Sequence, residues 1–154
     1  MRGVNLVTSE IKAFIGRSSL PYRVEVVRRE IQKYAIATGQ RAERYLSGDE
    51  APPMFVFGLF EELVGLEGLL SDGRQPASRL QPELPLKRVM AGGAKLKLFR
   101  PIRAGDVLVS IKTIKQVYEK QGSHGPIIFM TVENKVHTDK GELVLVEELL
   151  EISR

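Results

Sequence analysis

The pattern of hydrophobic and polar positions changes along the chain from helical spacing to strand-like alternation. Residues 22–26 alternate polar and apolar side chains, which is typical of a half-buried strand. Over residues 28–38 the apolar side chains instead recur at helical spacing, and Gly39 follows at the place where a left-handed residue commonly ends a helix. This part of the chain therefore predicts a strand followed by an amphipathic helix.

A second segment, residues 55–70, is apolar on nearly every face. Its main polar residues are the glutamates Glu61, Glu62 and Glu67, and its glycines lower the intrinsic helix propensity. A helix that is hydrophobic all round is normally buried. We therefore expect a helix here that depends on packing and around which a sheet wraps.

Strand-like alternation dominates the chain after Gly93. Before it, residues 71–88 contain turn residues and prolines and predict a long surface loop. The alternation slips near Thr113, which predicts a β-bulge, and a tight hairpin loop is expected with Gly141 at positive φ. Together these patterns predict an α+β fold in which a curved antiparallel sheet wraps around a central apolar helix.

The length and charge of the chain limit its class. Its 154 residues fit one globular domain, which we expect to span residues 1–154. We find no apolar run long enough for a transmembrane helix and no signal-peptide pattern at the N-terminus, so a cytoplasmic protein is expected. The net charge of +4 comes from scattered basic residues, which argues against a nucleic-acid partner, and no membrane partner is expected.

The residue types present also limit the chemistry. The chain has no cysteine and only two histidines, His124 and His137, so no metal site and no cysteine nucleophile are predicted. The histidines stand at opposite ends of one expected strand, too far apart to share a water molecule. Asp49 and Glu50 form a carboxylate pair, and adjacent acids of this kind are most often solvated loop residues.

Short motifs spread over most of the chain give it a family likeness. Their order and spacing carry the resemblance, and they comprise residues 34–39, 51–55, 119–122 and 125–129 together with Gly16-Arg17, Pro21-Tyr22, Ala91-Gly92-Gly93, Phe99-Arg100-Pro101 and Ala104-Gly105-Asp106. The chain resembles the hot dog fold and, within it, the MaoC-like acyl dehydratases and hydratases. It is most similar to the non-catalytic N-terminal half of the double hot dog proteins of the mesaconyl-CoA hydratase type. The resemblance implies a single hot dog fold.

The resemblance also implies where catalysis takes place in active members of the family. There, an Asp after the first helix and a His five residues later activate water for addition to an α,β-unsaturated acyl thioester, or for the reverse elimination. Alignment of the helix ends places Gln40 at the Asp position and Tyr45 at the His position. An amide does not titrate, and an unperturbed tyrosine has a pKa of about 10. No catalytic residue is therefore expected at these degenerate positions.

The same resemblance implies residues for substrate binding. Candidates for the lining of the acyl-thioester tunnel are Pro53, Phe55, Gly92 and Gly93. Candidates for binding the phosphates of coenzyme A are three arginines, Arg41, Arg44 and Arg100. The expected substrate is a thioester of coenzyme A or of acyl carrier protein, and no cofactor of the chain's own is expected.

We therefore expect a non-catalytic or accessory subunit of a heteromeric MaoC-like enoyl-CoA hydratase or 3-hydroxyacyl thioester dehydratase. A partner hot dog subunit would supply the Asp and His, while this chain shapes the acyl tunnel; a homodimer is the other assembly considered. Two alternatives stay open. One is a homo-oligomeric acyl-CoA thioesterase that uses Glu61, Glu62 or Glu67, and the other is a module that binds acyl thioesters without catalysis.

Overall fold

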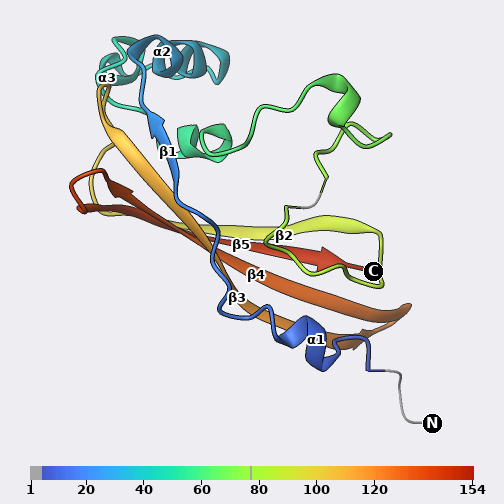
Figure 1. The fold of residues 1–154 in the computed structure, drawn as a ribbon. Helices are drawn as coiled ribbons and strands as arrows, with labels where there is room; N and C mark the ends of the chain where they lie inside the picture. The colour runs from blue at the N-terminus through green and yellow to red at the C-terminus, as the bar shows by residue number, and fades with distance from the viewer. Residues whose placement is uncertain (1–4, 77) are drawn as a thin grey trace.

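The computed structural model describes residues 5–76 and 78–154. Their five strands form one antiparallel sheet (Figure 1). The strand order is β1-β3-β4-β5-β2, so β1 and β2 form the two edges. The strands are β1 (Tyr22–Glu25), β2 (Val89–Leu98), β3 (Val107–Gly122), β4 (Gly125–Thr138) and β5 (Leu143–Ser153). This topology confirms the predicted curved antiparallel sheet.

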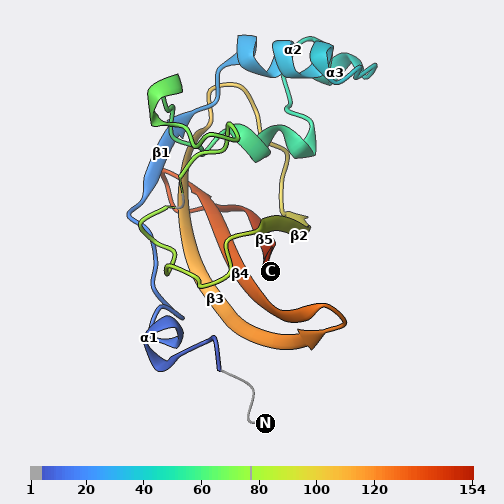
Figure 2. The same ribbon diagram turned by 90° about the vertical axis from the view of Figure 1, so that its right-hand side faces the viewer.

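The α-helices are short and lie at opposite ends of the sheet (Figures 1 and 2). One end carries α2 (Arg28–Ala37) and α3 (Glu43–Leu46), and the other carries α1 (Ser9–Lys12). The predicted amphipathic helix is confirmed as α2, which buries Ile31 and Ala35. Gly39 and Gly141 adopt the expected positive φ, at 67° and 87°. In the described part of the chain, no helix has the length and apolar character needed to cross a membrane.

The β3–β4 hairpin carries the predicted bulge. Its register steps from Ile114 opposite Val132 to Gln116 opposite Thr131, so one residue of β3 is left without a partner. An extra residue in one strand bends the pair and increases its twist. Figure 2 shows β3 and β4 curving along their length, which gives the sheet its concave face.

Two apolar clusters share one face of the sheet. Successive side chains of a strand point to opposite faces, so the alternately buried residues of β4 from Ile128 to Val136 lie on the same side. Val136 belongs to the cluster that packs with α2, whereas Ile128, Met130 and Val132 belong to the cluster that packs with α1. Asn134 is buried between the two clusters.

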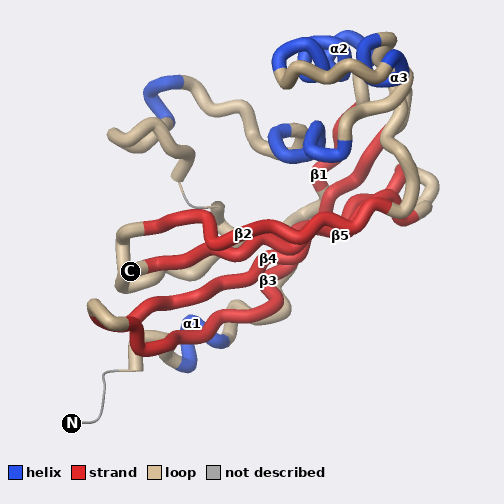
Figure 3. Tube along the Cα trace, turned by 180° about the vertical axis from the view of Figure 1, so that it is seen from behind, coloured by secondary structure: helices blue, strands red, loops and turns tan. Residues whose placement is uncertain are grey.

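The predicted helix over residues 55–70 is wrong. The chain forms a short 3₁₀ helix, η1 (Pro53–Gly58), then an irregular segment and the single turn η2 (Leu66–Gly68). Phe55 and Phe60 are buried, but Leu66 is 87% exposed and Leu63 is fully exposed. Figures 1 and 3 show the part of this segment around η2 standing away from the sheet. Each glycine costs about 1 kcal/mol in a helix interior, and the exposed leucines contribute no burial that offsets this cost.

Candidate functional site

Gln40 and Tyr45, which the family resemblance predicts to be degenerate catalytic positions, lie at the end of the sheet that carries α2 and α3. Gln40 follows α2, where its N–H donates to the carbonyl of Ala35 at 2.9 Å and its side-chain amide donates to Thr38 Oγ1 at 3.4 Å. Tyr45 lies in α3, and its hydroxyl accepts a hydrogen bond from Arg44 at 3.2 Å. Both side chains therefore engage neighbouring polar groups, and neither position holds an acid or an imidazole.

The carboxylates near these positions are paired with arginines. Asp49 accepts hydrogen bonds from Arg28 and from Ser47 Oγ, and these bonds lower the pKa of Asp49. Glu50 forms ion pairs with Arg44 at 3.5 Å and with an arginine of the β2–β3 turn at 3.6 Å. A carboxylate with a lowered pKa is a weaker base, so Asp49 is a poor candidate for a general base.

The three predicted phosphate ligands lie in two places. Arg41 is exposed between α2 and α3, and Arg44 is exposed in α3. Arg100 follows β2 and is largely enclosed, because its guanidinium binds Asp106 at 2.8 and 3.1 Å and Glu142 at 3.1 Å. These bonds give Arg100 a structural role in the turn between β2 and β3. A role in binding coenzyme A stays a prediction for all three arginines.

The predicted tunnel residues of the η1 segment differ in exposure. Pro53 is exposed at the first position of η1, whereas Phe55 is only 7% exposed. The ring of Phe55 meets the ring of Tyr34 edge-on, with centroids 5.6 Å apart. Phe55 is thus part of the apolar cluster that holds α2 on the sheet.

The predicted glycine pair lies on the edge strand β2, at a bulge. The register of β2 against β5 shifts between Ala91 and Gly93, and Gly93 has a φ of 143°. A Cβ at Gly92 would approach the side chains of Leu150 and Ile152 to 2.8 Å. Backbone geometry and close packing on β5 therefore account for both glycines, and their place at a tunnel mouth stays a prediction.

The histidines lie where the sequence places them, at opposite ends of β4. His124 is exposed in the β3–β4 turn, and His137 is half-buried near the last residue of β4. Within residues 5–76 and 78–154, no three His, Asp or Glu side chains gather as metal ligands do.

The glutamates of the thioesterase hypothesis lie on the exposed segment after η1 rather than on a buried helix. Glu61 accepts a hydrogen bond from Lys112 Nζ at 3.0 Å. Glu62 and Glu67 are exposed to solvent. None of these three glutamates therefore lies on a central helix, and their catalytic role stays a prediction.

Sequence reasoning missed a buried polar row that crosses the middle of the sheet. Ser110 Oγ hydrogen bonds to Asn134 Oδ1 at 2.6 Å, and Asn134 Nδ2 donates to Glu147 Oε2 at 3.4 Å. The three residues lie on β3, β4 and β5, where Asn134 stands directly opposite Glu147. A signal was present in the sequence, because Glu147 takes an inward position of β5 between Leu145 and Leu149.

A small cavity lies over this row. It has a volume of about 60 Å³, and its polar lining comes from Glu61, Lys112, Asn134 and Glu147. Burial raises the pKa of Glu147, although the Asn134 hydrogen bond and the charge of Lys112 act in the opposite direction. The cavity therefore combines a protonatable carboxyl with an amide and an ammonium group.

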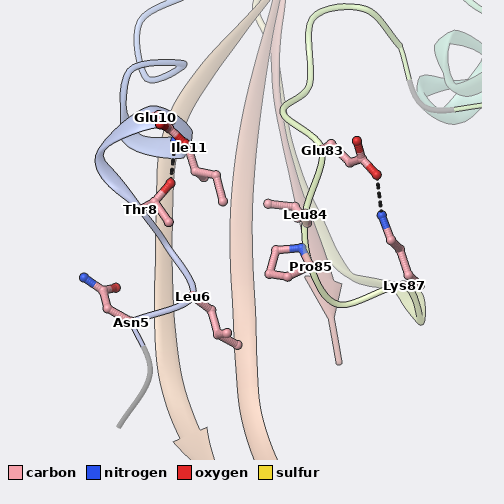
Figure 4. A pocket seen from close by; sticks show the side chains of 9 residues that line it. All are labelled: Asn5, Leu6, Thr8, Glu10, Ile11, Glu83, Leu84, Pro85 and Lys87. Carbon is pink, nitrogen blue, oxygen red and sulfur yellow. Dashed lines mark hydrogen bonds and ion pairs between the residues drawn. The ribbon is translucent and has the colours of Figure 1, made fainter. Parts of the chain in front are cut away.

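A larger open groove lies at the far end of the molecule. It has a volume of about 420 Å³ and runs between the segment around α1 and the loop of residues 83–87 (Figure 4). Among its polar side chains, Thr8 caps α1 and Lys87 binds Glu83 at 2.7 Å. Figure 1 places α1 at the opposite end from α2 and α3, so this groove is separate from Gln40 and Tyr45.

Comparison with known proteins identifies the family of this chain. The profile of the FAS1-like dehydratase domain region matches residues 13–147. The chain belongs to this family. It is also 30% identical over 145 residues to a UPF0336 protein of Streptomyces griseus, and the match covers 87% of this chain and 88% of that protein.

Two further likenesses agree with the MaoC-like hot dog assignment. Mesaconyl-C(4)-CoA hydratase of Chloroflexus aurantiacus is 28% identical over 97 residues, which covers 63% of this chain and 34% of that protein. A chain of the ChsH1-ChsH2 complex from Mycobacterium tuberculosis superposes with a TM-score of 0.68 at 18% identity, covering 94% of this chain and 87% of that one. The likeness to solved structures shows that this FAS1-like dehydratase chain has the hot dog fold of a MaoC-like dehydratase.

Proposed function

We propose that this FAS1-like dehydratase chain is a non-catalytic subunit of a heteromeric enoyl-thioester hydratase or 3-hydroxyacyl-thioester dehydratase. The observation that carries the proposal is the pair Gln40 and Tyr45 at the end of α2 and in α3, where the family resemblance expects an Asp and a His. A partner hot dog subunit supplies these two groups. This chain contributes binding surface for the acyl thioester of coenzyme A or acyl carrier protein.

The open edge of the sheet supports a partner subunit. Strand β2 pairs with β5 on one side only. Residues 89–95 of β2 are all exposed, among them the apolar Val89 and Met90. An exposed edge with apolar side chains favours pairing with another chain.

The absence of the helix predicted over residues 55–70 supports a role of this chain in binding the acyl group. Where a long buried helix was predicted, η1 covers only part of the concave face, and the segment after it leaves the sheet. Inner-face residues of β2 and β5, such as Leu96 and Leu149, are only half-buried as a result. Apolar surface of this kind suits an acyl chain.

One solved likeness is itself a complex of two different subunits. The ChsH1-ChsH2 structure contains a chain that superposes on almost the whole of this one. That protein is an assembly of two components, ChsH1 and ChsH2. For the present chain, this is support for a hetero-oligomer rather than for a homodimer.

The test is hydration of crotonyl-CoA by the chain alone and by the assembly that copurifies with it from its native host. We expect no turnover by the chain alone and turnover by the assembly. Reconstitution with Gln40→Ala and Tyr45→Phe chains should leave that turnover within about twofold. Robust hydration by the purified chain alone that survives both substitutions would overturn the proposal.

A further inference from the structure

The buried polar row is an unusual feature of an otherwise apolar face. Ser110, Asn134 and Glu147 are 1%, 2% and 6% exposed and lie between the two apolar clusters of the sheet. Burial of a carboxyl among apolar side chains costs free energy unless hydrogen bonds compensate for it. Apolar residues at these three positions would join the two clusters into one continuous core. Packing alone therefore does not explain why polar residues stand here.

One carboxyl oxygen of the polar row has no hydrogen-bond partner among the described residues. Ser110 and Asn134 bond each other at 2.6 Å, and the amide of Asn134 donates to one carboxyl oxygen of Glu147. The other carboxyl oxygen of Glu147 has no hydrogen-bond partner among residues 5–76 and 78–154. Glu147 and Asn134 both line the cavity of about 60 Å³ under η1. A polar cavity of this size has room for water or for a small polar group.

The rim of the cavity reaches solvent. Phe57 and Glu61 line it from the η1 side, and both side chains are about half exposed, at 53% and 52%. The chain beyond Glu61 then leaves the sheet. A group on a longer molecule can therefore enter the cavity from the surface that the missing helix leaves uncovered.

The charged groups around the cavity suit a neutral occupant. Lys112 and Glu61 already pair with each other at 3.0 Å, so neither is left to bind a charged group. A neutral hydroxyl needs no counter-charge, and it can donate to the free oxygen of Glu147.

We propose that Glu147 and Asn134 form a polar subsite that binds a hydroxyl substituent on the distal half of the substrate's acyl chain, distinct from the 3-hydroxyl that the reaction forms or removes. This inference rests on the proposed function, since it names the class of acyl group that the subunit accepts. Ser110 is a positioning residue, because its hydrogen bond fixes the amide of Asn134 so that its N–H group points to Glu147.

The experiment is calorimetric titration of the full-length chain with decanoyl-CoA and with a series of monohydroxydecanoyl-CoA isomers whose hydroxyl moves along the distal half of the chain. One isomer should bind about tenfold more tightly than decanoyl-CoA, as expected for a hydrogen bond to a carboxyl group. Glu147→Leu should abolish this preference. Glu147→Gln should retain part of it, because its amide oxygen still accepts a hydrogen bond.

Glu151→Leu is the matched control, because Glu151 lies four residues further along β5 on the same face and outside the cavity. It should leave the preference for the hydroxylated isomer unchanged, and thermal unfolding of each variant reports whether it is folded. Equal binding of all isomers and of decanoyl-CoA overturns the subsite, as does a preference that survives Glu147→Leu. Failure of every acyl-CoA to bind overturns the acyl-binding role in the proposed function as well.

Discussion

Arg100 and Asp106 form a two-pronged ion pair that closes the turn between β2 and β3. Two guanidinium nitrogens of Arg100 lie 2.8 and 3.1 Å from the two carboxyl oxygens of Asp106. Both side chains are less than one-fifth exposed, at 18% and 19%. Asp106 also accepts the N–H of Arg103 at 2.8 Å. The pair therefore fixes the connection between the edge strand and the long hairpin.

The Arg100–Asp106 pair predicts a loss of stability when its acid is removed. Asp106→Asn should lower the free energy of unfolding by about 1–3 kcal/mol at pH 7, because Arg100 loses its charged partner while it stays largely enclosed. Urea unfolding measures this loss. Asp139→Asn is the control, since Asp139 forms a more exposed pair with Arg23 at 3.5 Å and should change stability by less than about 1 kcal/mol.

The same pair has a pH dependence of known sign. Burial alone would raise the pKa of Asp106, but the hydrogen bonds from Arg100 and from the N–H of Arg103 outweigh it and lower the pKa. The stabilisation is present above the unfolded pKa of about 3.9 and is lost as the pH falls through the lower folded pKa. Asp106→Asn should therefore lose less stability than the wild type on acidification below about pH 4. Identical acid unfolding curves would contradict this assignment.

Glu147 predicts a pH dependence of the opposite sign. Its burial raises the pKa of the folded state, so the folded protein binds more protons than the unfolded chain above the unfolded pKa of about 4.3. The free energy of unfolding should then fall as the pH rises through the folded pKa of Glu147. Glu147→Gln should remove this fall, which urea unfolding at a series of pH values from 4 to 8 measures.

Glu151 supplies an internal comparison for that measurement. Its pKa is also raised by burial, although it accepts a hydrogen bond from Gln81 at 3.3 Å. Glu151→Gln should remove the part of the pH dependence that Glu151 contributes. The double variant Glu147→Gln with Glu151→Gln should remove the sum of the two contributions. Parallel stability curves for the wild type and Glu147→Gln would show that Glu147 is not the group responsible.

The sequence predicts most of the sheet because strand alternation is a local signal. The slip near Thr113 and the turn glycine Gly141 are visible in single residues, and both are confirmed. The helix over residues 55–70 could not be judged in this way. Its apolar residues fit a buried helix, but whether a surface exists to bury Leu63 and Leu66 depends on the tertiary structure.

In the candidate site, too, the sequence predicts some features and not others. The absence of an acid and an imidazole at Gln40 and Tyr45 follows from residue identity, which the sequence alone contains, and their match to the family's catalytic positions stays a prediction. The polar row depends on the register between three strands, since Asn134 meets Glu147 only because β4 and β5 pair in one alignment. Register across separate strands is set by the whole sheet, so the sequence shows the inward glutamate but not its partner.

Gly93 predicts a strong local requirement for glycine on the edge strand. Its φ of 143° is rarely adopted by residues with a side chain, so Gly93→Ala should cost about 1–3 kcal/mol in unfolding free energy. Gly58 is the matched control, because a Cβ there meets nothing within 4 Å and its φ is not in the left-handed range. Gly58→Ala should be neutral or stabilising by less than about 1 kcal/mol. Equal destabilisation by both substitutions would contradict a conformational requirement at Gly93.

The exposed leucines of the segment after η1 predict a surface for the partner subunit. Leu63→Lys with Leu66→Lys should change the unfolding free energy of the isolated chain by less than about 0.5 kcal/mol, because both side chains are in solvent. The same variant should reduce recovery of the partner from the native host, since charges would be placed in the apolar contact. Leu20→Lys is the control, because Leu20 is 87% exposed on the segment before β1 and should leave recovery unchanged. A destabilisation of more than about 1 kcal/mol would instead show that the leucines pack against the sheet of their own chain in solution, and that the concave face is covered without a partner.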